Sequence, residues 1–431
     1  MADSILHAGL SSGKAAAMLS DLTGSVGARL SGSPGAERAV EWARATMRAN
    51  DLDNVHLQSV MVPHWVRGSQ AEAAITNTMT GDPIGMHACA LGGSIGTPIA
   101  GIEGDVIEVK SLDEAAKLGA AAQGKIIFFN RPMDPTLSNT FEAYGRAVDQ
   151  RVSGVVAAGR IGAVAVLVRS MSTSIDTLPH TGMLRYDDSV TKVPAVAIST
   201  LDADRLSAML ASRPTVHVRL RLDCQTLPDV ESANVIGEIE GSEKSSEVIV
   251  LGAHLDSWDL ATGAHDDGAG CAQVLEALRL LKALKLRPKR TIRVVLFMNE
   301  ENGLRGATAY ASQLNDAREK HIAAIESDRG GFAPRGFEVE GEDADVARLA
   351  RWAKLFEAMG AERFSKGESG ADVGPLKKHG ALTIGLIPES QRYFDYHHAA
   401  SDTFSNVNPR ELELGSTAMA LLAYLISEEG L

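Results

Sequence analysis

The sequence has few cysteines, no long hydrophobic run and no excess of positive charge, and each absence excludes a class of protein. Its three cysteines lack the spacing of a disulfide framework or a cysteine zinc site, and at least one must be a free thiol. The apolar stretch 418–426 is far shorter than the ~18 residues of a membrane-spanning helix. With 42 Lys and Arg residues against 55 Asp and Glu residues, the net charge of −13 disfavours binding to nucleic acid.

The N-terminus also lacks the features of an export signal. Asp3 stands where a signal peptide carries positive charge, and Lys14 interrupts the apolar residues that follow. We therefore expect a cytoplasmic protein from the sequence as given, or a secreted or periplasmic one whose signal has been removed.

What the chain does have is the length for two or three domains and the composition of a globular protein. It contains 431 residues, of which 45% are hydrophobic and 23% are charged. From about residue 68 to 227 it is rich in Gly, Ala, Val, Ser and Thr, with short strand-like runs at 125–130, 163–168 and 193–198. We interpret this part as a self-contained insertion into an α/β domain formed by residues 1–67 and 228–431.

The C-terminal part of the sequence predicts a mostly parallel sheet. Apolar strands at 248–253 and 291–298 are joined by a helix over about 270–286, and a second helix is expected near 304–314. Crossover helices of this kind connect parallel strands and cover both faces of the sheet. Ligands of such sheets bind at the carboxyl ends of the strands.

Residues of the types that bind metals follow several of these strand ends. Each has an ordinary explanation on its own, such as a solvated turn, a helix N-terminus or a packed histidine. Together they favour a hydrolytic site for two metal ions, which needs a bridging carboxylate and further His and carboxylate ligands. The residues are His254, Asp256, Asp266, Asp267, Glu300, Glu301, Asp328, His397 and His398.

Five segments, in this order and spacing, resemble zinc peptidase family 28, which contains bacterial aminopeptidases and glutamate carboxypeptidases. They are HLDSWD (254–259), GAHDDGAG (263–270), MNEENG (298–303), ESDRGG (326–331) and HHAASDT (397–403). The likeness extends over nearly the whole chain, through GARLSGS (27–33), VPHWVRG (62–68), GGSIGTP (92–98), LPHTG (178–182) and LRPKRTIRVVLF (286–297). It is greatest to the glutamate carboxypeptidases of the family.

The resemblance implies two Zn²⁺ ions per chain and a ligand for each position around them. His254 and Asp328 would bind one ion, and Glu301 and His398 would bind the other. Asp266 would bridge the two ions. His398 is preferred to His397 because the family places this ligand four residues before an Asp-Thr pair.

The resemblance also assigns the catalytic groups beside the metals. Glu300 would be the general base that takes a proton from the attacking water and passes it to the leaving amine. Asp256 lies two residues after His254 in an extended segment, so its carboxylate would set the tautomer of that histidine. A cis peptide bond is implied between Asp266 and Asp267, and we interpret His265 as a bystander that points away.

The implied fold is a phosphorylase/hydrolase-like three-layer α/β sandwich with a mixed, mostly parallel sheet, interrupted by a protease-associated-like domain at 68–227. The resemblance also implies a homodimer. One departure is the segment 366–376, which matches the family only loosely, so the sequence assigns no role to Ser369 or Asp372.

The expected reaction is hydrolysis of dipeptides or short peptides, with release of a C-terminal residue. A free carboxylate is held by cationic or hydrogen-bonding groups, and the candidates are Arg392, Tyr393, Tyr396 and His180. An aminopeptidase and an amidohydrolase acting on non-peptide N-acyl amino acids remain alternatives.

Two further readings are disfavoured. A binding module that had lost its metals is expected to lack some of the metal ligands or the general base. This sequence contains the five implied ligands and the base. Catalysis by Ser94, within a G-x-S-x-G pattern, would need a helix directly afterwards, and Pro98 and two glycines follow instead.

Overall fold

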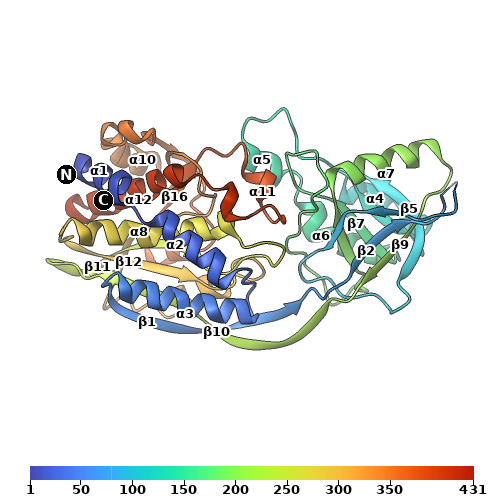
Figure 1. Cartoon of the computed structure of the whole chain (residues 1–431), viewed down its shortest axis with the longest axis horizontal. Coiled ribbons are helices and arrows are strands. Elements are labelled where there is room, and N and C mark those ends of the chain that lie inside the picture. Colours follow the sequence, from blue (N-terminus) through green and yellow to red (C-terminus); the bar gives the residue numbers. More distant parts are fainter. Residues whose placement is uncertain (79) are drawn as a thin grey trace. The chain divides into compact units, whose positions relative to one another are not determined.

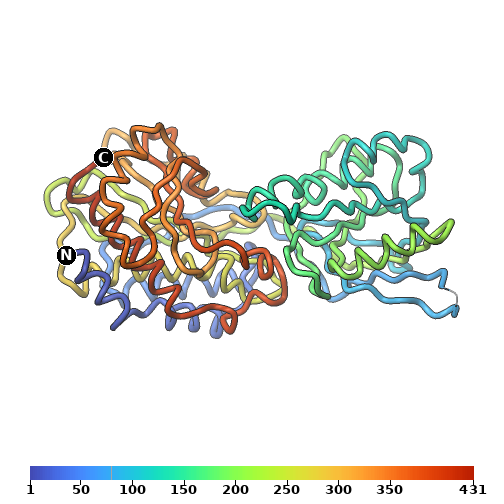
Figure 2. The backbone as a smooth tube through the Cα atoms, turned by 90° about the horizontal axis from the view of Figure 1, so that it is seen from above, coloured from blue at the N-terminus to red at the C-terminus, as the bar shows by residue number. Residues whose placement is uncertain are grey.

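The computed structural model describes residues 1–78 and 80–431, and the chain divides into two units. The first unit comprises Met1–Pro63, Asp229–Tyr393 and Asp402–Leu431. The second comprises His64–Pro228 and Phe394–Ser401. Both chain ends therefore belong to the first unit (Figure 2). Within the described residues, no helix has the length and apolar character needed to cross a membrane.

The first unit is built on a mixed sheet of eight strands (Figure 1). Their order is β1 (Asp53–Val66), β10 (Gln225–Ile239), β12 (Arg290–Phe297), β11 (Lys244–His254), β13 (Lys320–Glu326), β16 (Leu382–Pro388), β14 (Pro334–Glu340) and β15 (Arg363–Lys366). The central strands β12, β11, β13 and β16 are parallel, as the sequence predicts. β10 and β14 join them antiparallel on either side.

Helices cover both faces of this sheet because alternate residues of its strands point to opposite sides. Ile249 and Leu251 of β11 pack in the same core as α3 (Pro34–Ala49), α8 (Ala269–Ala283) and α12 (Pro409–Glu429). Val248 and Val250 pack on the other face with α9 (Arg305–Ser312) and the 3-10 helix Gly374–His379. The first unit also contains α1 (Ala2–Ser12), α2 (Ala15–Asp21) and α10 (Asp343–Ala350), whereas the short α11 (Tyr393–Tyr396) has its first residue here and the rest in the second unit.

Local capping signals mark where two of these helices begin. The Ser33 hydroxyl accepts a hydrogen bond from the Ala36 N–H, and Pro34 occupies the first turn of α3. Asn408 and Pro409 have the same roles at the start of α12. A polar N-cap satisfies helix N–H groups that have no partner inside the helix, and proline fits the first turn without losing a hydrogen bond.

The second unit has its own mixed sheet of eight strands. Their order is β3 (Ile84–Met86), β2 (Ala71–Ile75), β9 (His217–Leu222), β5 (Ile102–Val109), β6 (Ile126–Phe129), β7 (Ala165–Arg169), β8 (Ala195–Ile198) and β4 (Ala88–Ala90). The three strand-like runs of the sequence are observed as the buried strands β6, β7 and β8, which are parallel to one another. The helices are α4 (Leu112–Leu118), α5 (Thr140–Gly145), α6 (Asp149–Arg160) and α7 (Thr200–Ser212).

Ser94 and the cysteines have structural surroundings in this fold. Ser94 is fully buried, and its hydroxyl bonds to the Ile95 carbonyl and the Ala195 N–H. These contacts tie it to backbone groups, as expected for a residue that is not a nucleophile. The three cysteines are all buried.

The buried carboxylate of Glu413 links α12 to the start of α2 and predicts a pH-dependent stability. Its Oε1 accepts the Ala16 N–H at 3.2 Å, while Oε2 has no hydrogen-bond partner in the described chain. Burial, and then the neighbouring Glu276, raise the pKa of Glu413 to about 7. Because this pKa is raised above its unfolded value, its contribution to stability is present at acidic pH and is lost as the pH rises through about 7.

We therefore expect Glu413→Gln to unfold at a higher temperature than the wild type at pH 8, by about 1–3 °C, and at a similar temperature at pH 5. Glutamine retains the acceptor for Ala16 but cannot ionise. Differential scanning calorimetry at the two pH values measures the effect, with Glu37→Gln, an exposed position of α3, as control. An equal shift at both pH values would contradict this account of Glu413.

Candidate metal centre

The predicted metal ligands of the first unit meet where three neighbouring strands end. β11 ends at His254, which is paired in register with Phe297 of β12, and Gly252 is paired with Glu326 of β13. The acidic residues that follow β12 and β13 therefore emerge at the same edge of the sheet as His254. One potential ligand atom from each of His254, Asp266 and Asp328 lies within 4.8 Å of the others.

His254 is oriented toward the two carboxylates by the hydrogen bond of its other ring nitrogen. Nδ1 lies 3.0 Å from the backbone carbonyl oxygen of Asp256, which can only accept, so Nδ1 carries a hydrogen. Nε2 lies 3.1 Å from Asp266 Oδ1 and 3.4 Å from Asp328 Oδ1. Burial lowers the pKa of His254, but the two carboxylates outweigh it and the pKa lies well above its usual value. Nε2 faces both carboxylates, which is a position suited to binding a metal cation.

The Asp256 carboxylate acts elsewhere than the resemblance implies. Its Oδ1 lies 3.9 Å from His254 Nδ1 and accepts the backbone N–H groups of Asn299 at 2.8 Å and Glu300 at 3.0 Å. The carboxylate thus fixes the turn that carries the expected general base, while the histidine is oriented by the Asp256 backbone. The extended segment predicts that the side chains of His254 and Asp256 share one face of the chain. It does not predict which groups they bond to.

This difference predicts distinct effects for two substitutions of Asp256. Asp256→Ala leaves the N–H groups of Asn299 and Glu300 without an acceptor, and we expect kcat to fall about 10- to 100-fold. Asp256→Asn retains an oxygen acceptor, so kcat should stay within several-fold of the wild type. Steady-state kinetics with zinc analysis check both variants. An equal loss of kcat in Asp256→Asn and Asp256→Ala would instead indicate that the carboxylate charge acts on His254.

The loop that carries Asp266 is held by two further aspartates. The peptide bond between Asp266 and Asp267 is cis, as the resemblance implies. Asp402 accepts the N–H groups of His265 at 2.6 Å and Asp266 at 3.1 Å. Asp267 accepts those of His254 at 3.1 Å and Gly270 at 2.9 Å. The sequence does not predict this hydrogen-bonding role for either carboxylate, although Asp267 is among the candidate metal-site residues and both lie inside the matched segments.

Arg29 connects the same loop to the end of β11. It is fully buried, and its guanidinium donates to the backbone carbonyls of Leu255 at 2.6 Å and Gly263 at 2.9 Å. Its charge is therefore directed at carbonyl oxygens on both sides of the loop. Only its place in GARLSGS, a segment of the resemblance, marked this arginine in the sequence.

His265 faces away from the carboxylates, as expected for a bystander. Its Nε2 lies 3.2 Å from the Asn406 carbonyl, its Nδ1 accepts the Gly331 N–H at 3.2 Å, and its ring stacks on Phe332. Burial lowers its pKa to about 4, so the ring is neutral at pH 7.

The electrostatics of the site favour the binding of a cation. Burial, followed by the repulsion of neighbouring carboxylates such as Asp328, raises the pKa values of Glu300 and Asp267 well above the usual range. Burial and the carboxylates of Asp266 and Asp328 likewise raise the pKa of Tyr393, which lies beside them. Divalent cations stabilise the ionised form of such crowded acids. The residues present therefore fit a metal centre.

Two acidic residues that the sequence did not select enlarge this cluster. Glu326 ends β13, and its Oε2 accepts the Val373 N–H at 2.7 Å. Asp372 is 1% exposed, and neither carboxylate oxygen has a hydrogen-bond partner among residues 1–78 and 80–431. Burial, followed by repulsion from Asp328, raises the pKa of Glu326 to about 8. Burial, followed by repulsion from Glu326, raises the pKa of Asp372 well above its usual value. The loose match of 366–376 to the family gave too little signal to identify Asp372.

His398 lies in the segment 394–401, which packs as part of the second unit. The Thr181 N–H donates to the His398 carbonyl at 3.0 Å, and His398 Nδ1 lies 3.3 Å from the Thr181 carbonyl. Because that carbonyl accepts a hydrogen from Nδ1, Nε2 is the nitrogen suited to bind a metal.

The candidate substrate-binding residues differ from one another in burial and in the groups that they contact. His180 is buried, with Nδ1 2.7 Å from the His397 carbonyl. Tyr396 lies in α11 and is half-buried. Arg392 is paired with Glu411 at 3.4 Å and lies over the Phe332 ring. Its charge is thus already balanced by a carboxylate.

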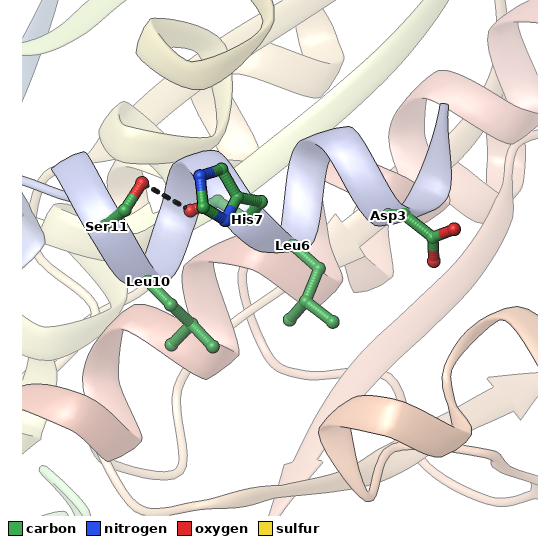
Figure 3. A pocket seen from close by; sticks show the side chains of 5 residues that line it. All are labelled: Asp3, Leu6, His7, Leu10 and Ser11. Atoms are coloured by element: carbon green, nitrogen blue, oxygen red, sulfur yellow. Dashed lines mark hydrogen bonds between the residues drawn. The ribbon is translucent and has the colours of Figure 1, made fainter.

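A separate pocket of about 340 Å³ lies on α1 of the first unit (Figure 3). It is lined by Asp3, Leu6, His7, Leu10 and Ser11, all from this one helix, and the Ser11 hydroxyl donates to the His7 carbonyl at 2.6 Å. None of these side chains belongs to the carboxylate cluster, so we assign the pocket no part in the chemistry.

Known proteins resemble the chain in sequence and structure. Residues 234–423 match the model of peptidase family M28. Carboxypeptidase Q from Bos taurus is 35% identical over 94% of this chain and 84% of that protein, and the Homo sapiens protein is 33% identical over the same shares. A peptidase M28 precursor from Shewanella amazonensis is 36% identical, with a TM-score of 0.95 over 100% of this chain and 96% of that one.

A zinc aminopeptidase from Bacillus subtilis shares the fold at 21% identity, with a TM-score of 0.67 over 94% of this chain and 93% of that one. The strand-end cluster of His254, Asp266 and Asp328 is of the kind expected for a metallopeptidase, and the identity to carboxypeptidase Q extends over 94% of this chain. The chain belongs to peptidase family M28 and is a metallo-exopeptidase homologue of carboxypeptidase Q.

Proposed function

We propose that this protein is a dizinc exopeptidase that hydrolyses dipeptides or short peptides and releases the C-terminal residue. The observation that carries the proposal is the position of His254 Nε2 between the carboxylates of Asp266 and Asp328. The carboxypeptidase named among the relatives supports the direction of cleavage.

The proposed ligands are those implied by the sequence. His254 and Asp328 would hold one zinc ion, Glu301 and His398 the other, and Asp266 would bridge them. Glu301 is 5% exposed, and its Oε1 accepts the Trp258 N–H at 3.1 Å, which orients the carboxylate. Oxygen and nitrogen donors of this kind suit zinc.

Glu300 is the proposed general base. Zinc, when bound, polarises the scissile carbonyl and makes water more acidic. The Glu300 carboxylate accepts the proton of the attacking water and delivers it to the nitrogen of the leaving amine. Its backbone is held by Asp256 at 3.0 Å, so the side chain starts from a fixed point. Tyr393, beside the carboxylates, is a candidate hydrogen-bond donor to the substrate.

An aminopeptidase is the second candidate, and Asp372 is the observation that favours it. A buried carboxylate without a hydrogen-bond partner in the described chain could hold the free α-amine of a substrate. The structural relative from Bacillus subtilis is an aminopeptidase, but its likeness concerns the fold. A dipeptidase would recognise both the free α-amine and the free α-carboxylate of its substrate.

Three matched substrates test the proposal on zinc-loaded protein: a free dipeptide, its N-acetyl derivative and its C-terminal amide. Loss of hydrolysis on amidation alone is the expected result. Loss on N-acetylation alone would indicate an aminopeptidase, and loss on both a dipeptidase. Rapid hydrolysis of N-acyl amino acids that contain no peptide bond would favour the amidohydrolase alternative.

The domain roles are also proposals. The second sheet, with its own helices, supports a protease-associated-like domain inserted at about 68–227 into a catalytic domain of residues 1–67 and 228–431. A homodimer is proposed from the family resemblance. Light scattering after size-exclusion chromatography tests it, and a mass near the 45.6 kDa of one chain would contradict it.

A further inference from the structure

Arg151 is a buried arginine of the second unit with two guanidinium nitrogens that have no hydrogen-bond partner among the described residues. It lies in the first turn of α6 and is 6% exposed. Nη2 donates to the Tyr144 hydroxyl at 2.7 Å. Nε and Nη1 are buried and have no hydrogen-bond partner among residues 1–78 and 80–431. A buried guanidinium with two nitrogens that lack acceptors is unfavourable, so this arrangement calls for an anionic partner from outside the chain.

Gly182 places this guanidinium beside His398, the proposed zinc ligand. A Cβ atom at Gly182 would lie 2.4 Å from Arg151 Nη1 and 2.8 Å from His398 Nδ1. The backbone of Gly182, with φ of +133°, also disfavours any larger residue. Because Gly182 has no side chain, Arg151 and His398 can both lie next to the same point of the backbone within the second unit.

The guanidinium is held in position by aromatic contacts. Its Cζ lies 5.5 Å from the centre of the Tyr144 ring, and Tyr144 is stacked on Phe394 at 4.8 Å. Phe394 belongs to the same short segment as His398. The tyrosine thus links Arg151 to the segment that carries the ligand, and a positioned arginine loses little freedom when it binds an anion.

Neighbouring candidates do not offer the same chemistry. Arg67 is committed to the Ala90 carbonyl and to Thr181 Oγ1, and Arg392 to Glu411. His180 is neutral at pH 7, since burial lowers its pKa to about 4, and its Nδ1 hydrogen is directed at the His397 carbonyl. Its Nε2 can therefore only accept, and a carboxylate offers no hydrogen.

We propose that Arg151 binds the free α-carboxylate of the substrate's C-terminal residue. This inference rests on the proposed function, because it needs His398 at the reacting centre and a substrate with a free carboxylate. Charge-assisted hydrogen bonds from a buried guanidinium would distinguish such substrates from their amides.

The test compares alanyl-leucine with alanyl-leucinamide on zinc-loaded wild type, Arg151→Gln and Arg151→Lys. For Arg151→Gln we expect kcat/KM for alanyl-leucine to fall on the order of 100-fold, mainly through KM, with the amide changed less than about threefold. Arg151→Lys should be intermediate because it retains the charge but not the fork of donors. Arg160→Gln, an exposed position on the same helix, is the matched control and should leave both substrates unchanged.

A binding experiment supplies a readout that does not depend on turnover. Calorimetric titration of leucine into zinc-loaded protein should show weaker binding in Arg151→Gln than in wild type, whereas leucinamide should bind both equally. Equal affinity of leucine for the two proteins would overturn the proposal.

The outcomes separate this inference from the proposed function. If wild-type protein hydrolyses the amide as fast as the free dipeptide, the carboxypeptidase proposal is wrong. If wild type prefers the free dipeptide and folded Arg151→Gln keeps that preference, the assignment of Arg151 is wrong. If neither Arg151 variant folds, Tyr144→Phe replaces them, because it removes the hydrogen-bond partner of Arg151 Nη2. We expect this variant to raise KM for alanyl-leucine several-fold and to leave KM for the amide unchanged. An unchanged KM would again overturn the assignment.

Discussion

Glu300→Gln is expected to lower kcat about 10³- to 10⁴-fold while the protein keeps its zinc. Glutamine has nearly the same shape, and its backbone N–H can still donate to Asp256, as that of Glu300 does at 3.0 Å. It cannot accept the proton of the attacking water or deliver one to the leaving amine. The loss should therefore appear in kcat, with a small change in KM.

Zinc analysis and circular dichroism on the same preparation separate loss of the base from loss of the site. Glu357→Gln, an exposed glutamate of the first unit, is the control and should retain full activity. Substantial turnover by zinc-loaded Glu300→Gln would show that the proton passes through another group. Loss of zinc would show that Glu300 is a ligand.

Removal of zinc is expected to destabilise the folded protein by about 4 kcal/mol when the wild type is measured at zinc concentrations about 1,000-fold above Kd. In the metal-free protein, the carboxylates of Asp266 and Asp328 both lie beside His254 Nε2, and Glu300 and Asp267 have pKa values raised by burial and by their neighbours. Carboxylates crowded in this way repel one another when ionised. The difference should be largest near neutral pH and shrink in acid, where the carboxylates and His254 take up protons and release zinc.

Calorimetry with chelator, and again after zinc is restored, measures this effect. Asp266→Asn is the matched variant, because it removes the proposed bridging charge while the backbone hydrogen bond to Asp402 can persist. Its melting temperature should respond much less to zinc. Identical melting temperatures for wild type with and without chelator, at neutral pH, would contradict a metal centre at these residues.

The sheet and the position of the site could be predicted because they depend on local patterns. The apolar runs at 248–253 and 291–298 are continuous, and the structure places them in β11 and β12. Their helix is observed as Ala269–Ala283, close to the expected 270–286. Polar residues directly after parallel strands must emerge at one edge, so the convergence of His254 and Asp328 followed from topology.

The supporting contacts could not be predicted because they join distant parts of the chain. Arg29 bonds to Leu255, 226 residues away, and no local pattern reports such a pair. His254 is hydrogen-bonded to the backbone carbonyl of Asp256 and not to its carboxylate, which depends on the exact backbone conformation after the strand. Arg151 gave no signal at all, because an arginine in the first turn of a helix is ordinarily exposed.

Anomalous diffraction at the zinc edge from crystals of the zinc-loaded protein tests the central claim most directly. The account predicts two peaks about 3.5–4 Å apart. One should lie against His254 and Asp328, the other against Glu301 and His398, with Asp266 between them. A single peak, or peaks on other residues, would contradict the proposed dizinc centre.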